Sequence, residues 1–530
     1  MPRRHDAIIH PFAGLDLPWL LQTQAQASPE KILLTWAPFD APPRAYSYAE
    51  FYDLVGRAAA GIKARGVAVG DRILVHLENC PEFLIVWCAI AELGAIAVTT
   101  NTRSSVPELD YYIEHSGCSG AITQPSLLAC VAEAGRNLGW IVTTEYDAGQ
   151  SPAKGSQPGT IDSFSALIAR DPLKPRRQAA ADPRRPIAVQ YTSGTTSRPK
   201  GVVITHGNAL WAGRVSSAHE ALLREDVHLI YAPLFHVNAL GYSFLPALWV
   251  GASVVLQPRF SKSRFWRTAC DHRATWGSMI IFAVRALTEV ENPTWQPFRC
   301  WGGAGANALL AQKIGVHMLG WYGMTETISH PICGYPDLPN RTDFIGRPAP
   351  EYGVRIVDAN DSPSPFGETG LLKVRGVMGV SLFGGYLNDE AATKNAFDEN
   401  GWFITGDRVV PYEDGSIRFA ERDKDMLKVG GENVASSEVE RVIAAIEGII
   451  EVAVVGKPHP MLDEVPVAFI RLSPDVPDDA RSMLIERVHA ACASALADFK
   501  RPHDLIIIDE FPRAVLDKIA KAQLRARLIA

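Results

Sequence analysis

The sequence predicts an α/β protein with a large N-terminal domain and a smaller C-terminal domain. Between positions 49 and 98, helical patterns alternate with short apolar runs, such as a helix at 51–66 followed by a strand at 72–77. This alternation is typical of a largely parallel sheet covered by helices. A chain of 530 residues is also too long for one compact core, so at least two domains are expected.

The pattern changes in the middle of the chain. From 354 to 415, short strand-like runs are separated by Gly, Pro and Asp turns. Such runs predict a small β-barrel-like subdomain that completes the N-terminal domain of stacked αβ sheets.

Helix and strand patterns alternate again after Arg422. We therefore divide the chain into residues 1–422 and a small α+β domain at 423–530. The segment 155–186 is rich in Pro, Arg, Ala and Ser and lacks periodicity, so we expect an exposed connection there.

Composition excludes several classes of protein. The chain is 47% hydrophobic and 21% charged with a net charge of −6, which favours neither disorder nor nucleic-acid binding. No signal peptide is recognisable at the N-terminus, and the apolar stretch 83–98 contains Glu92 and Gly94. We interpret that stretch as a buried helix and strand rather than a membrane span. The eight cysteines are scattered without metal-ligand spacing, which indicates reduced thiols in a cytoplasmic protein.

The run 191–201 is the most informative part of the sequence. It concentrates hydroxyls, glycines and one lysine between apolar runs at 187–189 and 201–204, which predicts a loop joining two strands. Glycine backbone N–H groups, the hydroxyls of 192–196 and the positive charge of Lys200 are suited to phosphate. In a nucleotide-binding P-loop, Ser or Thr would follow the Gly-Lys pair directly, and that order is absent here. The alternative is a solvated Ser/Thr/Gly loop.

This loop resembles the signature loop of the adenylate-forming superfamily, which includes acyl-CoA synthetases and peptide-synthetase adenylation domains. The spacing and wording of 235–238, 323–327 and 431–434 also resemble bacterial ligases of the carnitine/crotonobetaine-CoA type. Four further elements resemble motifs of the same superfamily in the same order. They are Trp321–Glu326, Gly401–Asp407, Arg422–Asn433 and Phe511–Lys518.

The resemblance implies an ATP-dependent ligase that needs ATP, Mg²⁺ and CoA and acts on a small-molecule carboxylic acid. The acid attacks the α-phosphorus of ATP, and the resulting acyl-AMP then passes its acyl group to CoA. Lys518, Thr325 and Glu326 are implied in catalysis, with Glu326 also binding the metal. Residues implied in nucleotide binding are Thr192, Ser193, Gly194, Thr195, Thr196, Lys200, Gly303, Ala304, Tyr322, Gly323, Asp407 and Arg422.

The resemblance also implies an acyl pocket and a mobile C-terminal domain. The pocket residues are Phe235, His236, Val237, Leu240, Gly302 and Met324. From the small volume of Gly302 and Gly303 we expect room for a bulky acid. Lys424 corresponds to the hinge, and Gly430 and Gly431 to the tunnel for the thiol arm.

Several alternatives stay open at this level. The run 303–308 fits Gly-x-Gly-x-x-Ala, a dinucleotide-binding pattern, and Asp517 stands before Lys518 where the superfamily usually has glycine. An enzyme that stops at acyl-AMP or passes the acyl group to a carrier protein, or a catalytically silent nucleotide-binding protein, would share these motifs. The sequence leaves a homodimer open.

Overall fold

The structure is a computed structural model. It describes residues 10–148, 162–174, 181–192, 198–303, 313–338, 341, 344–422, 426–477, 480–512 and 519–528. Within these ranges, no helix is long and apolar enough to cross a membrane.

The first large sheet has seven strands in the order β7-β6-β5-β3-β4-β8-β9, and all neighbours are parallel except β8 and β9. Its antiparallel edge confirms the predicted strands on either side of 193–197, which lie outside the described residues. The strands are β3 (Arg72–His76), β4 (Ile96–Thr99), β5 (Cys118–Thr123), β6 (Ile141–Thr143), β7 (Asp162–Ser163), β8 (Pro186–Thr192) and β9 (Lys200–Thr205).

The second large sheet has nine strands in the order β16-β15-β14-β13-β12-β10-β11-β1-β2, and its central strands are parallel. They are β1 (Ile32–Trp36), β2 (Arg44–Ser47), β10 (Val227–Ile230), β11 (Ser253–Leu256), β12 (Trp276–Met279), β13 (Cys300–Gly303), β14 (His317–Tyr322), β15 (Ile332–Cys333) and β16 (Arg347–Pro348).

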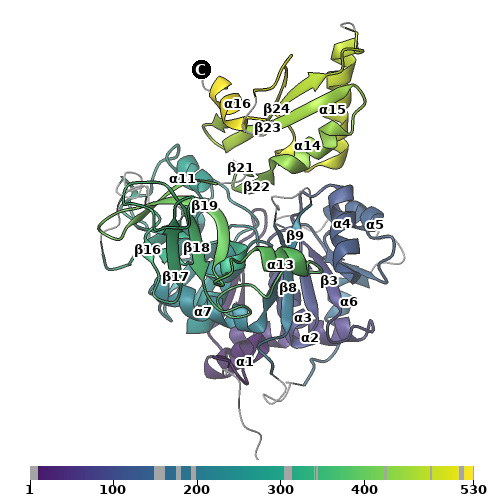
Figure 1. Cartoon of the computed structure of the whole chain (residues 1–530). Coiled ribbons are helices and arrows are strands. Elements are labelled where there is room, and N and C mark those ends of the chain that lie inside the picture. Colours follow the sequence, from purple (N-terminus) through teal and green to yellow (C-terminus); the bar gives the residue numbers. More distant parts are fainter. Residues whose placement is uncertain are drawn as a thin grey trace, which may run out of the picture.

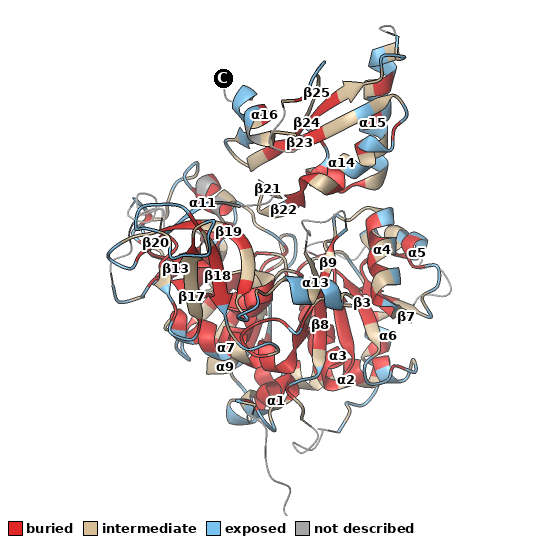
Figure 2. Cartoon of the chain, viewed as in Figure 1, coloured by how far each residue is buried: buried red, intermediate tan, exposed pale blue. Residues whose placement is uncertain are grey.

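One continuous core contains side chains from both sheets and from the helices α2, α3 and α7. Helix α3 is buried along its whole length, as expected for a helix that is apolar on all faces; Figure 2 shows this core in red. The helices and turns of this domain are α1 (Leu17–Ala27), α2 (Tyr48–Lys63), α3 (Pro81–Glu92), α4 (Val106–Ser116), η1 (Pro125–Leu127), α5 (Leu128–Ala134), α6 (Phe164–Leu167), α7 (His206–His219), α8 (Val237–Ala239), η3 (Leu240–Phe244), α9 (Leu245–Val250), α10 (Phe265–Asp271), α11 (Ile281–Leu287), η4 (Thr325–Thr327) and α13 (Glu390–Asn395).

The predicted β-rich subdomain corresponds to a four-stranded antiparallel sheet in the order β17-β18-β19-β20. It comprises β17 (Gly353–Val357), β18 (Gly370–Arg375), β19 (Phe403–Pro411) and β20 (Ile417–Arg422). Strand β19 carries Asp407 toward the end of β14, where Tyr322 lies.

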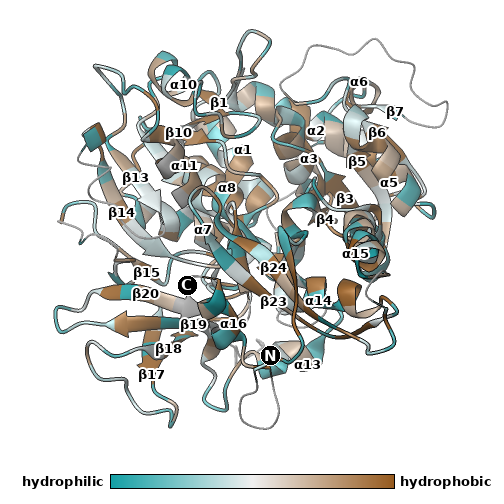
Figure 3. Ribbon diagram, turned by 90° about the horizontal axis from the view of Figure 1, so that it is seen from above, coloured by the Kyte–Doolittle hydropathy of each residue, from teal (hydrophilic) through white to brown (hydrophobic). Residues whose placement is uncertain are grey.

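A small C-terminal domain lies above the large one (Figure 1). Seen from above, β23 and β24 cross the middle of the large domain (Figure 3). Its elements are β21 (Met426–Val429), β22 (Glu432–Ala435), α14 (Ser436–Ala444), β23 (Ile449–His459), β24 (Asp463–Leu472), α15 (Arg481–Ala495), η6 (Asp498–Lys500), β25 (Asp504–Ile507) and α16 (Lys521–Arg527). The boundary at 422/423 stays a prediction, because 423–425 lie outside the described residues.

The expectation of an exposed connection at 155–186 is wrong for its central part. Strand β7 extends the edge of the seven-stranded sheet, and α6 buries Phe164 and Leu167 against the domain. Residues 162–167 are too few to show the hydrophobic periodicity of a helix or strand, so their burial could not be predicted from the local sequence.

Gly61 provides a test of this packing. A Cβ at this position of α2 would overlap the backbone carbonyl of Leu167, so Gly61→Ala is expected to lower the free energy of unfolding by about 1–3 kcal/mol through overpacking. Helix propensity alone predicts a gain of about 1 kcal/mol. Urea unfolding measures the sign of the change in the free energy of unfolding. Ala60→Gly, in the same helix, measures the effect of helix propensity alone. A stabilised Gly61→Ala protein would contradict the packing of α6.

Candidate functional site

A cavity of about 1570 Å³ lies between the two domains. It is lined by most of the predicted site residues that the structure describes. These are Thr192, Lys200, Phe235, His236, Val237, Tyr322, Gly323, Met324, Thr325, Glu326, Asp407, Gly430 and Gly431. Residues that are far apart in the sequence therefore form one site.

At one end of the cavity, Tyr386 contacts both Lys200, the first residue of β9, and Glu326, the predicted metal-binding residue. The Lys200 ammonium lies 4.6 Å from the centre of the Tyr386 ring. The Tyr386 hydroxyl donates to Glu326 Oε1 at 3.0 Å. Burial and the Glu326 charge raise the pKa of Tyr386 above its usual value, so the hydroxyl stays protonated and serves as a donor.

Glu326 is buried, with only 5% of it exposed. It lies in η4, whose exit residue Ile328 has φ +64°. A β-branched residue rarely adopts this conformation. The turn is held by Tyr352, whose hydroxyl donates to the carbonyl of Thr327 at 2.7 Å.

Tyr322 and Asp407, two of the residues predicted to bind the nucleotide, contact each other. The Tyr322 hydroxyl donates to Asp407 Oδ2 at 2.7 Å, and both residues are buried. The pair fixes the orientation of the carboxylate, and the Tyr322 ring stacks near Phe419.

The loop after β10 forms the acyl side of the cavity, and Asn79 holds it in place. The Asn79 side chain accepts from Leu234 N at 2.8 Å and donates to Ala232 O at 2.9 Å. This buried amide thereby presents Phe235 and His236 to the cavity.

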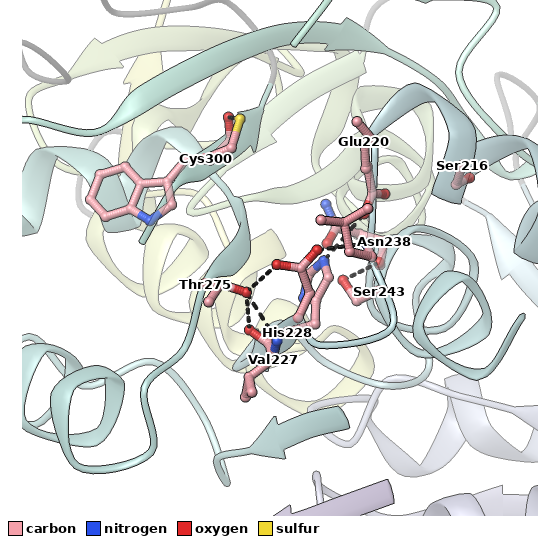
Figure 4. Close-up of polar contacts among 12 residues, drawn as sticks. Ser216, Glu220, Val227, His228, Asn238, Ser243, Thr275 and Cys300 are labelled. Atoms are coloured by element: carbon pink, nitrogen blue, oxygen red, sulfur yellow. Dashed lines mark hydrogen bonds and ion pairs between the residues drawn. The ribbon is translucent and has the colours of Figure 1, made fainter. Parts of the chain in front are cut away.

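A buried polar cluster anchors the start of β10 (Figure 4). The Thr275 hydroxyl donates to Asp226 Oδ1 at 2.7 Å and accepts from Val227 N at 3.0 Å. Next to it, His228 lies 3.6 Å from the Glu220 carboxylate, and both side chains are fully buried. Burial raises the pKa of Glu220. Because these groups are buried and bonded to one another at the start of β10, we interpret the cluster as structural support for the site.

The far wall of the acyl side is aromatic and apolar. Tyr231 is 2% exposed, and its hydroxyl accepts from Ile280 N at 3.2 Å. Phe260 packs against Tyr231 and Phe282, with ring centres at 5.3 Å and 5.8 Å. Other apolar residues of the cavity are Met279, Val284 and Met318.

The glycine argument for a roomy acyl pocket is wrong. A Cβ at Gly302 would overlap the Trp321 ring, and one at Gly303 would overlap the Met279 carbonyl. These glycines allow close packing of neighbouring strands rather than space for substrate. Neither glycine lines the cavity, nor does the buried Leu240.

The β21–β22 hairpin of the small domain covers the acyl side. Gly430 and Gly431, with φ +59° and +92°, form its turn, as in type I′ hairpins. The next residue, Glu432, places Oε2 3.1 Å from Nε2 of His236. This ion pair joins the two domains at the mouth of the acyl pocket.

Some predicted residues cannot be placed. Ser193, Gly194, Thr195, Thr196, Ala304, Lys424 and Lys518 lie outside the described residues, and of Arg422 only the backbone is described, paired with Asp407 across β19 and β20. Gly303 ends β13, so the Gly-x-Gly-x-x-Ala run continues beyond the described part.

Sequence reasoning missed Tyr386, Asn79 and the pairing of Glu432 with His236. Their partners are 60, 155 and 196 residues away, so no local pattern connects them. The glycine pair before Tyr386, Gly384–Gly385, was the available signal of a special turn.

The pair between His236 and Glu432 predicts a pH-dependent domain contact. Burial lowers the pKa of His236, but Glu432 outweighs it and raises the pKa above its usual value. Burial likewise raises the pKa of Glu432, and His236 reverses the shift and lowers it. The contribution of protonated His236 to the stability of the folded protein is full below about pH 6.5, the ordinary pKa of histidine. It is lost as pH rises through the raised pKa of His236. The contribution of Glu432 is lost in acid, as pH falls through its lowered pKa.

We therefore expect the Tm difference between the wild-type protein and His236→Gln to be largest near pH 6 and to shrink by pH 9. His489→Gln, on an exposed position of α15, is the control and should show no such trend. A difference that stays constant with pH would contradict the ion pair.

Comparison with known proteins places the chain in a family. The family profile described as "AMP-binding enzyme" matches residues 21–387, and that described as "AMP-binding enzyme C-terminal domain" matches 438–518. The crotonobetaine/carnitine–CoA ligase of Proteus mirabilis is 31% identical over 94% of this chain and 97% of its own length.

Among solved structures, the chain is similar to o-succinylbenzoate CoA synthetase of Bacillus subtilis, at 26% identity over 96% of this chain and 98% of that one. The TM-score is 0.82 for a double mutant of that enzyme bound to a CoA product analogue. It is 0.67 for the same enzyme with AMP. The chain belongs to the family of AMP-binding enzymes.

Proposed function

We propose that the chain is an ATP-dependent acyl-CoA ligase whose acid is apolar. The enzyme joins the acid to the α-phosphorus of ATP with release of pyrophosphate. It then transfers the acyl group from acyl-AMP to the thiol of CoA with release of AMP. The observation that carries this proposal is the single cavity that unites Lys200, Glu326 and Asp407 with an apolar wall and the small-domain hairpin.

The nucleotide would lie along the Lys200 to Asp407 side. The loop 192–196 and Lys200 would hold the β- and γ-phosphates, and Thr325 would contact the α-phosphate. Tyr322 and Gly323, with Gly303 and Ala304 behind them, would border adenine, and the Asp407 carboxylate would accept from the ribose hydroxyls, assisted by Arg422. Positioning and charge neutralisation dominate such phosphoryl chemistry.

Mg²⁺ fits the residues present. A magnesium ion in such sites is held by one or two carboxylates and by substrate phosphates. Glu326 is a buried carboxylate that lines the cavity and is oriented by Tyr386. When bound, the ion would neutralise phosphate charge, and Tyr386 would keep Glu326 directed at it.

Two lysines would serve the two halves of the reaction. Lys518 would contact the acid and the α-phosphate during adenylation, and Lys424 would act as the hinge that reorients the small domain. Gly430 and Gly431 would border the path of the thiol arm. The higher similarity to the structure with a CoA product analogue supports assigning the described arrangement to the CoA-transfer step.

The wall of the acyl side supports an apolar acid. Tyr231, Phe260 and Met279 offer rings and a thioether, which are suited to hydrocarbon. Crotonobetaine and carnitine, named for the relatives, carry a quaternary ammonium. The wall formed by Tyr231, Phe260 and Met279 carries no carboxylate, and of the carboxylates that line the same cavity, Glu78 lies beside Asn79 and Glu432 lies at the mouth of the pocket.

The proposal predicts selective product formation across a panel of acids. Purified protein with ATP and Mg²⁺ is given short, long-chain, aromatic, polycyclic and betaine acids, with and without CoA, and pyrophosphate and acyl products are measured by mass spectrometry. Apolar acids should give acyl-CoA, and carnitine should give little. Preference for the betaines would overturn the apolar assignment, acyl-AMP alone would favour an adenylation-only enzyme, and no release from any acid would contradict the ligase.

The control for this assay is Lys518→Ala, which is expected to lower acyl-AMP formation on the order of 100-fold, as for loss of a transition-state contact.

We further propose a cytoplasmic location, supported by the cysteines, all of which are free thiols. A homodimer stays a prediction.

A further inference from the structure

At the edge of the cavity, the two domains meet through three buried charges. Lys500, at the end of η6, pairs with Glu108 of α4 and, at 2.9 Å, with Glu438 of α14. The exposed fractions of the three side chains are 8%, 7% and 3%. Figure 1 shows α4 at the side of the large domain that faces α14 and α15.

Two hydrogen bonds between the domains surround this group. Ala497 N donates to Glu108 Oε2 at 3.2 Å, and the Ser105 hydroxyl donates to Ala495 O at 2.8 Å. The N-terminal end of α4 therefore faces the C-terminal end of α15, an arrangement that the two helix dipoles favour.

The partners divide into contacts within a domain and contacts between domains. Glu438 and Lys500 both belong to the small domain, so their ion pair is kept when that domain changes its orientation. Glu108 also accepts from Ser105 N at 2.7 Å, which caps its own helix. Of the contacts that Glu108 makes, those with Lys500 and Ala497 cross between the domains and exist only in this orientation.

The charge of Lys500 makes this contact strong. Burial lowers its pKa, but Tyr112 and the two carboxylates outweigh burial and raise the pKa above its usual value. Lys500 is therefore charged, and loss of Glu108 would leave it with Glu438 as its remaining buried carboxylate partner.

We propose that Glu108 is a positioning residue for the second half-reaction, because its pair with Lys500 clamps the small domain over the acyl site in the orientation for CoA transfer. This inference rests on the proposed function. Glu108 acts on the equilibrium between domain orientations and touches neither nucleotide nor acid.

The test separates the two half-reactions in Glu108→Gln. Glutamine keeps the helix cap of Ser105 and removes the Glu108 charge, so that Lys500 keeps only its pair with Glu438 in its own domain. Acyl-AMP formation from an accepted acid should be unchanged, whereas single-turnover acyl-CoA formation from supplied acyl-AMP should slow by about 10- to 100-fold, in the range of coupling energies between sites. Equal rates in wild type and variant, or equal loss in both steps, would overturn the clamp.

A double-mutant cycle with Lys500→Met guards against a general loss of stability. If the pair is the cause, the double variant should transfer no more slowly than Lys500→Met alone; additive losses would contradict the proposal. Failure of the proposed function is distinguished from failure of the clamp, because it would leave even the wild-type protein without acyl-CoA.

Discussion

The contact between the small domain and the mouth of the cavity determines what this site can do. In the described orientation, the β21–β22 hairpin sets Glu432 against His236 and Gly431 beside Ile280, whose Cδ1 would lie 3.5 Å from a Cβ on that glycine. The acyl side is thereby covered by a turn without side chains. A path bordered by two glycines leaves room for a slender thiol arm beside the acyl pocket.

The large domain supplies a rigid frame for this contact. Asn79 fixes the loop that carries His236, and the buried cluster around Asp226 fixes the strand before it. On the nucleotide side, Tyr386 and Tyr322 orient the Glu326 and Asp407 carboxylates through their hydroxyls. Each carboxylate is therefore oriented by a neutral hydroxyl donor, which does not cancel its charge.

Local features of the sequence were sufficient to predict the elements with strong patterns. The apolar helix α3 and the strands β8 and β9 each depend on residues next to them in the chain. The role of Gly302 could not be predicted, because the Trp321 ring that fills its space comes from the neighbouring strand β14. The pair of Glu108 and Lys500 spans 392 residues, and only the packing of two domains brings it together.

The central claim is that the described arrangement serves CoA transfer and not adenylation. A reversible cross-link tests it most directly. Ser105→Cys and Ala495→Cys, at positions that share a hydrogen bond across the domains, are joined by a short thiol cross-linker after Cys118, Cys130 and Cys270, which are partly exposed, are replaced by serine. The account predicts that the linked protein converts supplied acyl-AMP and CoA to acyl-CoA but forms no acyl-AMP from acid and ATP until the link is cleaved. Acyl-AMP formation by the linked protein at the unlinked rate would contradict it.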